Sequence, residues 1–156
     1  MHIRLLAVGD RQPAWVDDAF GMYSERFPRE WRFRLDSLPT ERRAKNAPAD
    51  RAIAAEGEKL LARLGTDEQL ILLDERGKSL TSIALGERLS GWQADGRDLA
   101  FVIGGPDGVS AEVKKAAAFA WSLSDLTLPH GLARVLFAEQ LYRAWTLSTG
   151  HPYHRQ

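Results

Sequence analysis

Four consecutive large apolar residues, Leu70-Ile71-Leu72-Leu73, set the strictest limit on the architecture of this chain. A strand with one face in water alternates apolar and polar side chains, and this run does not alternate. The strands of a parallel sheet are apolar throughout, because helices cover both of their faces. The run therefore predicts an α/β fold with a mostly parallel sheet flanked by helices.

The rest of the chain alternates strand and helix patterns. The apolar run belongs to a strand predicted at residues 69–74, and further strands are predicted at residues 2–8, 31–35, 99–103 and 121–128. Helices are predicted from Pro13 to Pro28, up to about Leu64, from Ile83 to Gly96, after an N-cap at Ser110, and from Leu132 to Thr149. With no repeats, linkers or low-complexity tracts, residues 1–156 are predicted to form a single domain.

Several classes of protein are excluded by what the sequence lacks. The absence of cysteine rules out a disulfide, a thiolate zinc site and a cysteine nucleophile. The apolar stretch Ile3–Val8 is too short for a signal peptide, and no apolar run approaches the ~18 residues of a membrane span. We therefore expect a cytoplasmic protein with no membrane partner. His151 and His154 have no third histidine or carboxylate nearby in sequence, so no metal site is expected.

The net charge of zero conceals an uneven distribution of charge. Residues 22–45 carry seven basic and four acidic side chains, whereas residues 46–129 have a net charge of −4. Residues 130–156 add three arginines and three histidines against one glutamate. The basic segment, which we define as residues 39–48, has few apolar residues and is predicted to be an exposed loop. The two basic regions either form one patch for a nucleic acid or are ordinary solvated surface.

Three glycines follow the predicted strand at residues 99–103, in Gly104-Gly105-Pro106-Asp107-Gly108. We call residues 104–108 the glycine loop. Ligands of parallel sheets bind beyond the carboxyl ends of the strands, and glycines let the backbone approach a ligand closely. The spacing matches neither a Walker A loop nor a GxGxxG fingerprint. The loop is thus either a ligand site or a tight strand-to-helix turn.

Two further segments combine residue types that suit a ligand. In the leucine segment, residues 123–130, main-chain groups could bind an adenine while leucines enclose its ring; otherwise it is a buried strand end with a proline turn. Asp125 within it is more typical of a carboxylate that bonds to local amides than of a base. The C-terminal tail, His151-Pro152-Tyr153-His154-Arg155-Gln156, suits stacking on a nucleic-acid base, or is simply a frayed end. No catalytic triad or paired carboxylates occur.

A set of short motifs, occurring in one order over essentially the whole chain, is more specific than any single one. The set comprises Leu6-Ala7-Val8-Gly9, Lys45-Asn46-Ala47, Glu56-Gly57-Glu58, Leu73-Asp74, the glycine loop, Leu126-Thr127-Leu128-Pro129-His130, Leu141-Tyr142-Arg143-Ala144-Trp145 and the C-terminal tail. Together these motifs resemble the bacterial ribosomal RNA large-subunit methyltransferase H family, the YbeA-like proteins of the SPOUT class.

This resemblance implies a SPOUT fold with a C-terminal trefoil knot, a homodimer, and S-adenosylmethionine as methyl donor. The implied reaction is methylation of N3 of a pseudouridine in 23S ribosomal RNA of the large ribosomal subunit. The donor-binding positions that the resemblance implies lie in the loops that the sheet argument marks. They are Leu73, Gly104, Leu123, Ser124, Asp125, Leu126, Thr127 and Leu128.

The chemistry requires that N3 lose a proton, and the sequence does not identify the group that accepts it. The catalytic candidates are His154, Tyr153 and Arg155, with His130 as a weaker one. The RNA-binding candidates are Arg42, Arg43, Lys45 and Arg134. With no appended RNA-binding domain, the dimer itself is expected to supply the RNA surface. Our hypothesis is that one protomer holds the donor while its partner contributes the segment around Arg42, Arg43 and Lys45; Arg143 is a candidate phosphate or dimer contact.

Two other functions fit the same residues. One is a ribosome-binding module that keeps the fold without methyl transfer, which calorimetry with the methyl donor would distinguish. The other is a methyltransferase of the same class that acts on transfer RNA. The sequence also leaves open whether the substrate is free RNA, the large subunit or the assembled ribosome.

Overall fold

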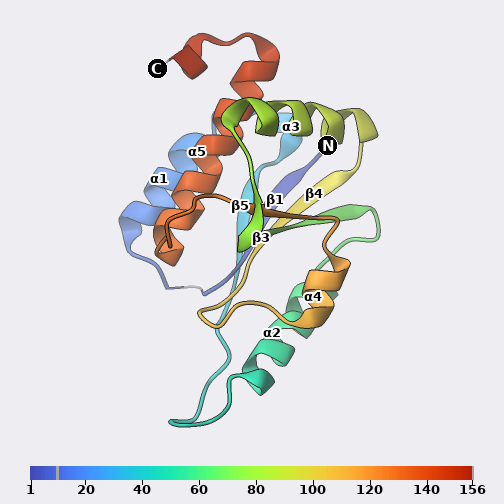
Figure 1. Ribbon diagram of the computed structural model, residues 1–156. Coiled ribbons are helices and arrows are strands. Elements are labelled where there is room, and N and C mark those ends of the chain that lie inside the picture. Colours follow the sequence, from blue (N-terminus) through green and yellow to red (C-terminus); the bar gives the residue numbers. More distant parts are fainter. Residues whose placement is uncertain (10, 156) are drawn as a thin grey trace.

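The computed structural model of the protein describes residues 1–9 and 11–155, and its core is a sheet of five parallel strands in the order β2-β1-β4-β3-β5 (Figure 1). The strands are β1 (Ile3–Val8), β2 (Arg34–Leu38), β3 (Glu68–Ser79), β4 (Asp98–Ile103) and β5 (Phe119–Ser122). The helices are α1 (Ala14–Ser24), α2 (Asp50–Ala62), α3 (Ser82–Asp95), α4 (Ala111–Ala116) and α5 (His130–Thr149). Two 3₁₀ turns, η1 (Arg29–Trp31) and η2 (Pro152–Arg155), complete the described elements.

Helices cover both faces of the sheet, as the apolar run predicts. Alternate residues of the run point to opposite faces: Ile71 packs in the core under α1, α3 and α5, whereas Leu70 and Leu72 pack in the core under α2 and α4. Phe101 and Val102 of the neighbouring strand β4 divide in the same way. Each face therefore has its own hydrophobic core, and α1, α3 and α5 lie together on one side (Figure 1).

Local sequence signals set the ends of several helices. Ser110 is the N-cap of α4, and its hydroxyl accepts a hydrogen bond of 3.3 Å from the amide of Val113, as predicted. Gly57 in the middle of α2 lets that helix pack directly on this cap, because an added Cβ would lie 2.9 Å from Ser110 Cβ and closer still to its hydroxyl. Glycines with positive φ end α3 at Gly96 and α5 at Gly150.

Two strand predictions were wrong in position. The alternating pattern of Trp31, Phe33 and Leu35 predicted a strand at residues 31–35, but β2 begins at Arg34. Trp31 lies instead in η1, where its ring packs against Phe27 and Trp145, so burial among distant aromatic rings produces the pattern.

The strand predicted at residues 121–128 is in fact β5, Phe119–Ser122. The serine hydroxyls end it: Ser122 donates to the carbonyl of Ser124, and the Ser124 hydroxyl accepts from the amide of Leu126. These bonds turn the chain out of the sheet.

The longest strand, β3, leaves the ladder with β5 for part of its length. Trp121 pairs with Leu73 and again with Lys78, so residues 74–77 form an excursion between the two pairings. Gly77 then passes so close to β5 that an added Cβ would lie 2.7 Å from backbone atoms of Ala120 and Trp121. The C-terminal tail is described as far as Arg155, since Gln156, like Asp10, lies outside the described residues.

Candidate active site

A cavity of about 690 Å³ lies at the carboxyl ends of β4 and β5 and beside residues 72–76 of β3, at the edge of the sheet where a ligand site is expected. Three stretches of chain form most of its wall: the excursion after Leu73, the glycine loop after β4, and the leucine segment after β5. Lys114 of α4 and His130 and Ala133 of α5 complete it. The glycine loop and the leucine segment, which the sequence analysis singled out, are thus brought together with the excursion after Leu73 around one cavity.

The glycine loop is a compact turn whose backbone faces this cavity. An added Cβ at Gly104 would lie 2.5 Å from Val109 Cγ1 and 3.0 Å from the carbonyl of Gly108, so no side chain fits there. Gly105 and Gly108 pair across the turn, with a 3.0 Å bond from the Gly108 amide to the Gly105 carbonyl, and Gly108 has φ +86°. The tight-turn and ligand-loop interpretations are therefore compatible.

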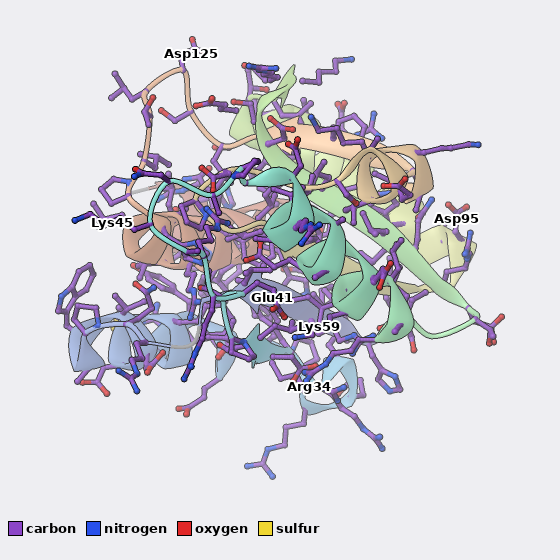
Figure 2. All side chains as sticks on the ribbon, turned by 90° about the horizontal axis from the view of Figure 1, so that it is seen from below. Arg34, Glu41, Lys45, Lys59, Asp95 and Asp125 are labelled. Carbon is purple, nitrogen blue, oxygen red and sulfur yellow. The ribbon has the colours of Figure 1, made fainter. Side chains whose placement is uncertain are left out.

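Six of the eight donor-binding positions implied by the resemblance line the cavity: Leu73, Gly104, Leu123, Ser124, Thr127 and Leu128. Asp125 and Leu126 do not. Leu126 is 75% exposed, and the Asp125 carboxylate, at the outer tip of its loop in Figure 2, accepts a 3.3 Å bond from the Ser79 hydroxyl. The side chains of these two residues point to solvent rather than to a ligand in the cavity.

His130, at the first turn of α5, is the titratable wall residue with the clearest perturbation. Burial, together with the positive charge of Arg134, lowers the pKa of His130 to about 4, so its imidazole is neutral at pH 7. Its Nε2 atom is buried and has no hydrogen-bond partner among residues 1–9 and 11–155. His130 therefore contributes a neutral imidazole to the cavity wall, with its Nε2 enclosed by the protein.

Arg134 was predicted to contact RNA, and that prediction was wrong. Its side chain is fully buried, and its guanidinium donates hydrogen bonds to the carbonyl of Gly9 and, at 3.5 Å, to the hydroxyl of Ser37. Arg134 thus ties α5 to the ends of β1 and β2. A guanidinium enclosed in this way cannot reach a phosphate group in solution.

The C-terminal tail lies far from the cavity of its own chain. The 20 residues of α5 span about 30 Å, with His130 at one end and the tail beyond the other, opposite α2 and α4 (Figure 1). Tyr153 packs against Tyr142, with ring centroids 4.8 Å apart, and its hydroxyl donates to Glu139 at 3.1 Å. His154 and Arg155 lie beside it in η2.

This environment also limits what Tyr153 can do. Burial, a hydrogen bond with Tyr23 and the nearby Glu139 carboxylate all raise the pKa of the Tyr153 phenol. The hydroxyl therefore stays protonated at neutral pH, where it can donate a hydrogen bond but cannot act as a base.

The basic segment divides into two kinds of residue. Arg42 and Lys45 are exposed, and Lys45 projects from the outer part of the loop (Figure 2). Arg43 instead forms an ion pair with Asp107 of the glycine loop. This pair holds the basic segment beside the cavity of its own chain, so no partner is required to bring it there.

One buried carboxylate at this site was missed by sequence reasoning. Glu56 of α2 is only 3% exposed and lies beneath the glycine loop, where its Oε2 atom would be 2.9 Å from a Cβ added at Gly105. The signal available in the sequence was Glu56 followed by glycine inside a predicted helix. That signal does not show that the carboxylate lies beside Gly105, more than 40 residues away.

The described part of the chain contains no group of three or more histidine and carboxylate side chains that could hold a metal ion. Within it, no helix is both long and apolar enough to cross a membrane.

Comparison with known proteins adds independent findings. The family model described as a predicted SPOUT methyltransferase matches residues 1–154. The chain is 49% identical over 156 residues, covering all of both proteins, to the ribosomal RNA large subunit methyltransferase H of Laribacter hongkongensis. It is 47% identical over 155 residues, covering 99% of each protein, to the protein of the same name from a Janthinobacterium species.

A solved structure is similar in fold. It is a putative methyltransferase from Legionella pneumophila in complex with the bound cofactor SAM, and the TM-score is 0.50 at 14% sequence identity. The match covers 92% of this chain and 66% of that one.

Proposed function

The chain belongs to the SPOUT methyltransferase family, and from that membership we propose that it transfers the methyl group of S-adenosylmethionine to ribosomal RNA of the large ribosomal subunit. We further propose that the acceptor is N3 of a pseudouridine in 23S RNA, and that the enzyme works in the cytoplasm as a homodimer. The observation that carries the proposal is the cavity at the carboxyl ends of β4 and β5, beside residues 72–76 of β3.

The wall of this cavity suits an adenosyl methyl donor. Its volume falls in the usual range for small-molecule sites, and leucine side chains offer an apolar enclosure for an adenine ring. Gly104 lines the cavity with backbone alone, and its lack of a side chain lets the glycine loop close against Val109 and Gly108. We propose that Leu73, Gly104, Leu123, Ser124, Thr127 and Leu128 hold the donor, and that Asp125 and Leu126 offer at most main-chain contacts.

S-adenosylmethionine, when bound, supplies an electrophilic methyl group. The protein must then align the acceptor nitrogen with that methyl group and let the N3 proton depart, and positioning can supply most of the acceleration. We propose that the neutral His130 imidazole is part of the wall against which the acceptor base lies. With a pKa of about 4 it is too weak a base to take the imide proton efficiently.

His154, Tyr153 and Arg155 can act only in a different geometry. Since α5 separates them from the cavity of their own chain, we propose that they reach the cavity of the partner subunit. Exposed apolar side chains of α1 and α5, namely Trp15, Met22 and Leu132, offer a face for such a dimer. We also propose the C-terminal trefoil knot, which the family resemblance implies.

Dimer formation is measured by light scattering after size exclusion. The doubly substituted protein Trp15→Glu/Met22→Glu should elute as a monomer and lose methyl transfer, whereas Ile83→Glu on α3, which is also exposed, should change neither. A Trp15→Glu/Met22→Glu variant that remains dimeric would refute this choice of face.

The test of the function is mass mapping of ribosomal RNA from cells with and without the gene. One methylated pseudouridine of 23S RNA should lose 14 mass units in the deletion strain. Purified protein with labelled donor should then modify large subunits or whole ribosomes but not isolated transfer RNA. Labelling of transfer RNA would indicate the alternative substrate, and failure to bind the demethylated product in calorimetry would indicate a module without methyl transfer.

A further inference from the structure

The basic segment and the glycine loop are joined by one side chain, Arg43. Its Nη1 forms the ion pair with Asp107, and its Nη2 lies 3.6 Å from Oε1 of Glu56. The Arg43 side chain is only 24% exposed. A side chain whose only role is to contact RNA is expected to be fully exposed. Arg43 therefore bridges a loop of the cavity wall and a buried carboxylate of α2.

Arg43 is the cation that lies beside the buried carboxylate of Glu56. Oε1 of this buried carboxylate accepts a 3.0 Å bond from the Glu41 amide, while Oε2 has no hydrogen-bond partner among the described residues. An isolated buried carboxylate is costly, and the positive charge of the nearby guanidinium offsets part of that cost. A second ion pair, between Lys59 and Glu41, holds the start of the same segment on α2 (Figure 2).

The two neighbours of Arg43 that face solvent are those available to RNA. Arg42 and Lys45 are exposed, so a phosphate bound by them would rest on a segment whose position depends on the Arg43–Asp107 pair. The same pair restrains the glycine loop, whose Gly104 lines the cavity. One ion pair thus lies on the path between the two binding surfaces.

We propose that Arg43 is a positioning residue through which RNA binding at the basic segment and donor binding at the glycine loop strengthen each other. This inference rests on the proposed function. By linkage, subunits must raise the affinity for the donor by the same factor as the donor raises the affinity for subunits. Asp107 is 40% exposed, so we expect a factor of about 5 to 10, at the lower end of the usual range.

The experiment measures binding of S-adenosylhomocysteine by calorimetry, with and without saturating large ribosomal subunits. The unmodified protein should bind about 5- to 10-fold more tightly when subunits are present. Arg43→Gln should weaken binding severalfold without subunits and lose the gain that subunits give. Asp107→Asn should behave like Arg43→Gln, and the double variant should show no additional loss.

Matched controls separate positioning from simple loss of charge. Arg42→Gln should weaken subunit binding but keep the affinity for S-adenosylhomocysteine without subunits, and Arg51→Gln, an exposed arginine of α2 outside both loops, should change neither. Arg43→Lys, which keeps the cation, should restore part of the coupling that Arg43→Gln removes. Thermal melts identify any variant that fails to fold, and Asp107→Asn, on an exposed loop, then gives the decisive measurement.

The inference is overturned if Arg43→Gln and Asp107→Asn bind S-adenosylhomocysteine as the unmodified protein does and keep its response to subunits. It is also overturned if Arg42→Gln and Arg43→Gln have the same effects. Failure of the unmodified protein itself to bind S-adenosylhomocysteine is a different result, because it removes the proposed function as well.

Discussion

Two glycines inside helices should respond in opposite ways to the same substitution. Gly57 of α2 packs on the Ser110 cap of α4, where an added Cβ would lie 2.9 Å from Ser110 Cβ and 3.4 Å from Val113 Cγ2. At Gly91 of α3 an added Cβ would meet no described atom within 4 Å outside the neighbouring residues and the backbone of its own helix. Replacing either residue with alanine makes the same chemical change.

The magnitudes follow from these surroundings. In the interior of a helix, alanine is favoured over glycine by about 1 kcal/mol, so Gly91→Ala should stabilise the protein by roughly 0.5–1 kcal/mol. At Gly57 that gain is offset by loss of the Ser110 cap, which is worth about 1 kcal/mol. The clash then decides the outcome, and overpacking of this kind costs about 1–3 kcal/mol. Gly57→Ala should therefore lower the melting temperature by about 3–10 °C.

The assay is thermal and urea denaturation of both variants at one protein concentration, since an oligomer's stability depends on concentration. Ser110→Gly provides a further check, because it removes the atoms that clash while costing only a few tenths of a kcal/mol as a cap. Gly57→Ala/Ser110→Gly should therefore recover most of the lost stability. If Gly57→Ala is as stable as Gly91→Ala, the contact between α2 and the α4 cap does not have the geometry described.

Three other substitutions test the groups around the site. The folded-state pKa of His130, about 4, is below the ordinary 6.5, so the unfolded chain binds the proton first and stability is lost as the pH falls from about 6.5 to 4. His130→Gln should therefore flatten the dependence of the unfolding free energy on pH in this range. An unchanged slope would contradict the lowered pKa. Arg134→Met should cost about 2–4 kcal/mol in urea denaturation, because the Gly9 carbonyl loses its buried donor; a variant as stable as the parent would mean that the guanidinium is not enclosed. Tyr153→Phe should leave the pH profile of methyl transfer between pH 7 and 9 unchanged, because the raised pKa keeps the phenol protonated. If the unmodified protein shows a rate that rises with pH in this range and Tyr153→Phe abolishes the rise, Tyr153 is a base after all.

The parts of the structure that could be predicted from sequence depend on local patterns. The unbroken apolar run at residues 70–73 specifies a strand covered on both faces, and from this the parallel sheet and the position of the cavity at its carboxyl edge follow. Ser110 was identified because a cap needs only residues three positions away.

The sequence predictions failed for side chains whose environment is determined by residues far away in the sequence. Arg134 looks like surface charge until the carbonyl of Gly9, 125 positions earlier, is placed beside it. Arg43 differs from Arg42 only through Asp107 and Glu56, which sequence alone does not bring near. The separation of the tail from the cavity, by contrast, was calculable, since the predicted helix from Leu132 to Thr149 already spans about 27 Å.

The double pairing of Trp121 determines how this sheet accommodates a ligand. Because four residues of β3, 74–77, are skipped in its pairing with β5, three of them, Asp74, Glu75 and Arg76, stay free of that partner strand and line the cavity. We call this stretch of the cavity wall the vestibule. Lengthening or shortening that skipped stretch would resize the vestibule while both flanking runs of ladder stayed intact. Gly77 permits the return to β5, so any side chain there would force β3 and β5 apart where their pairing resumes.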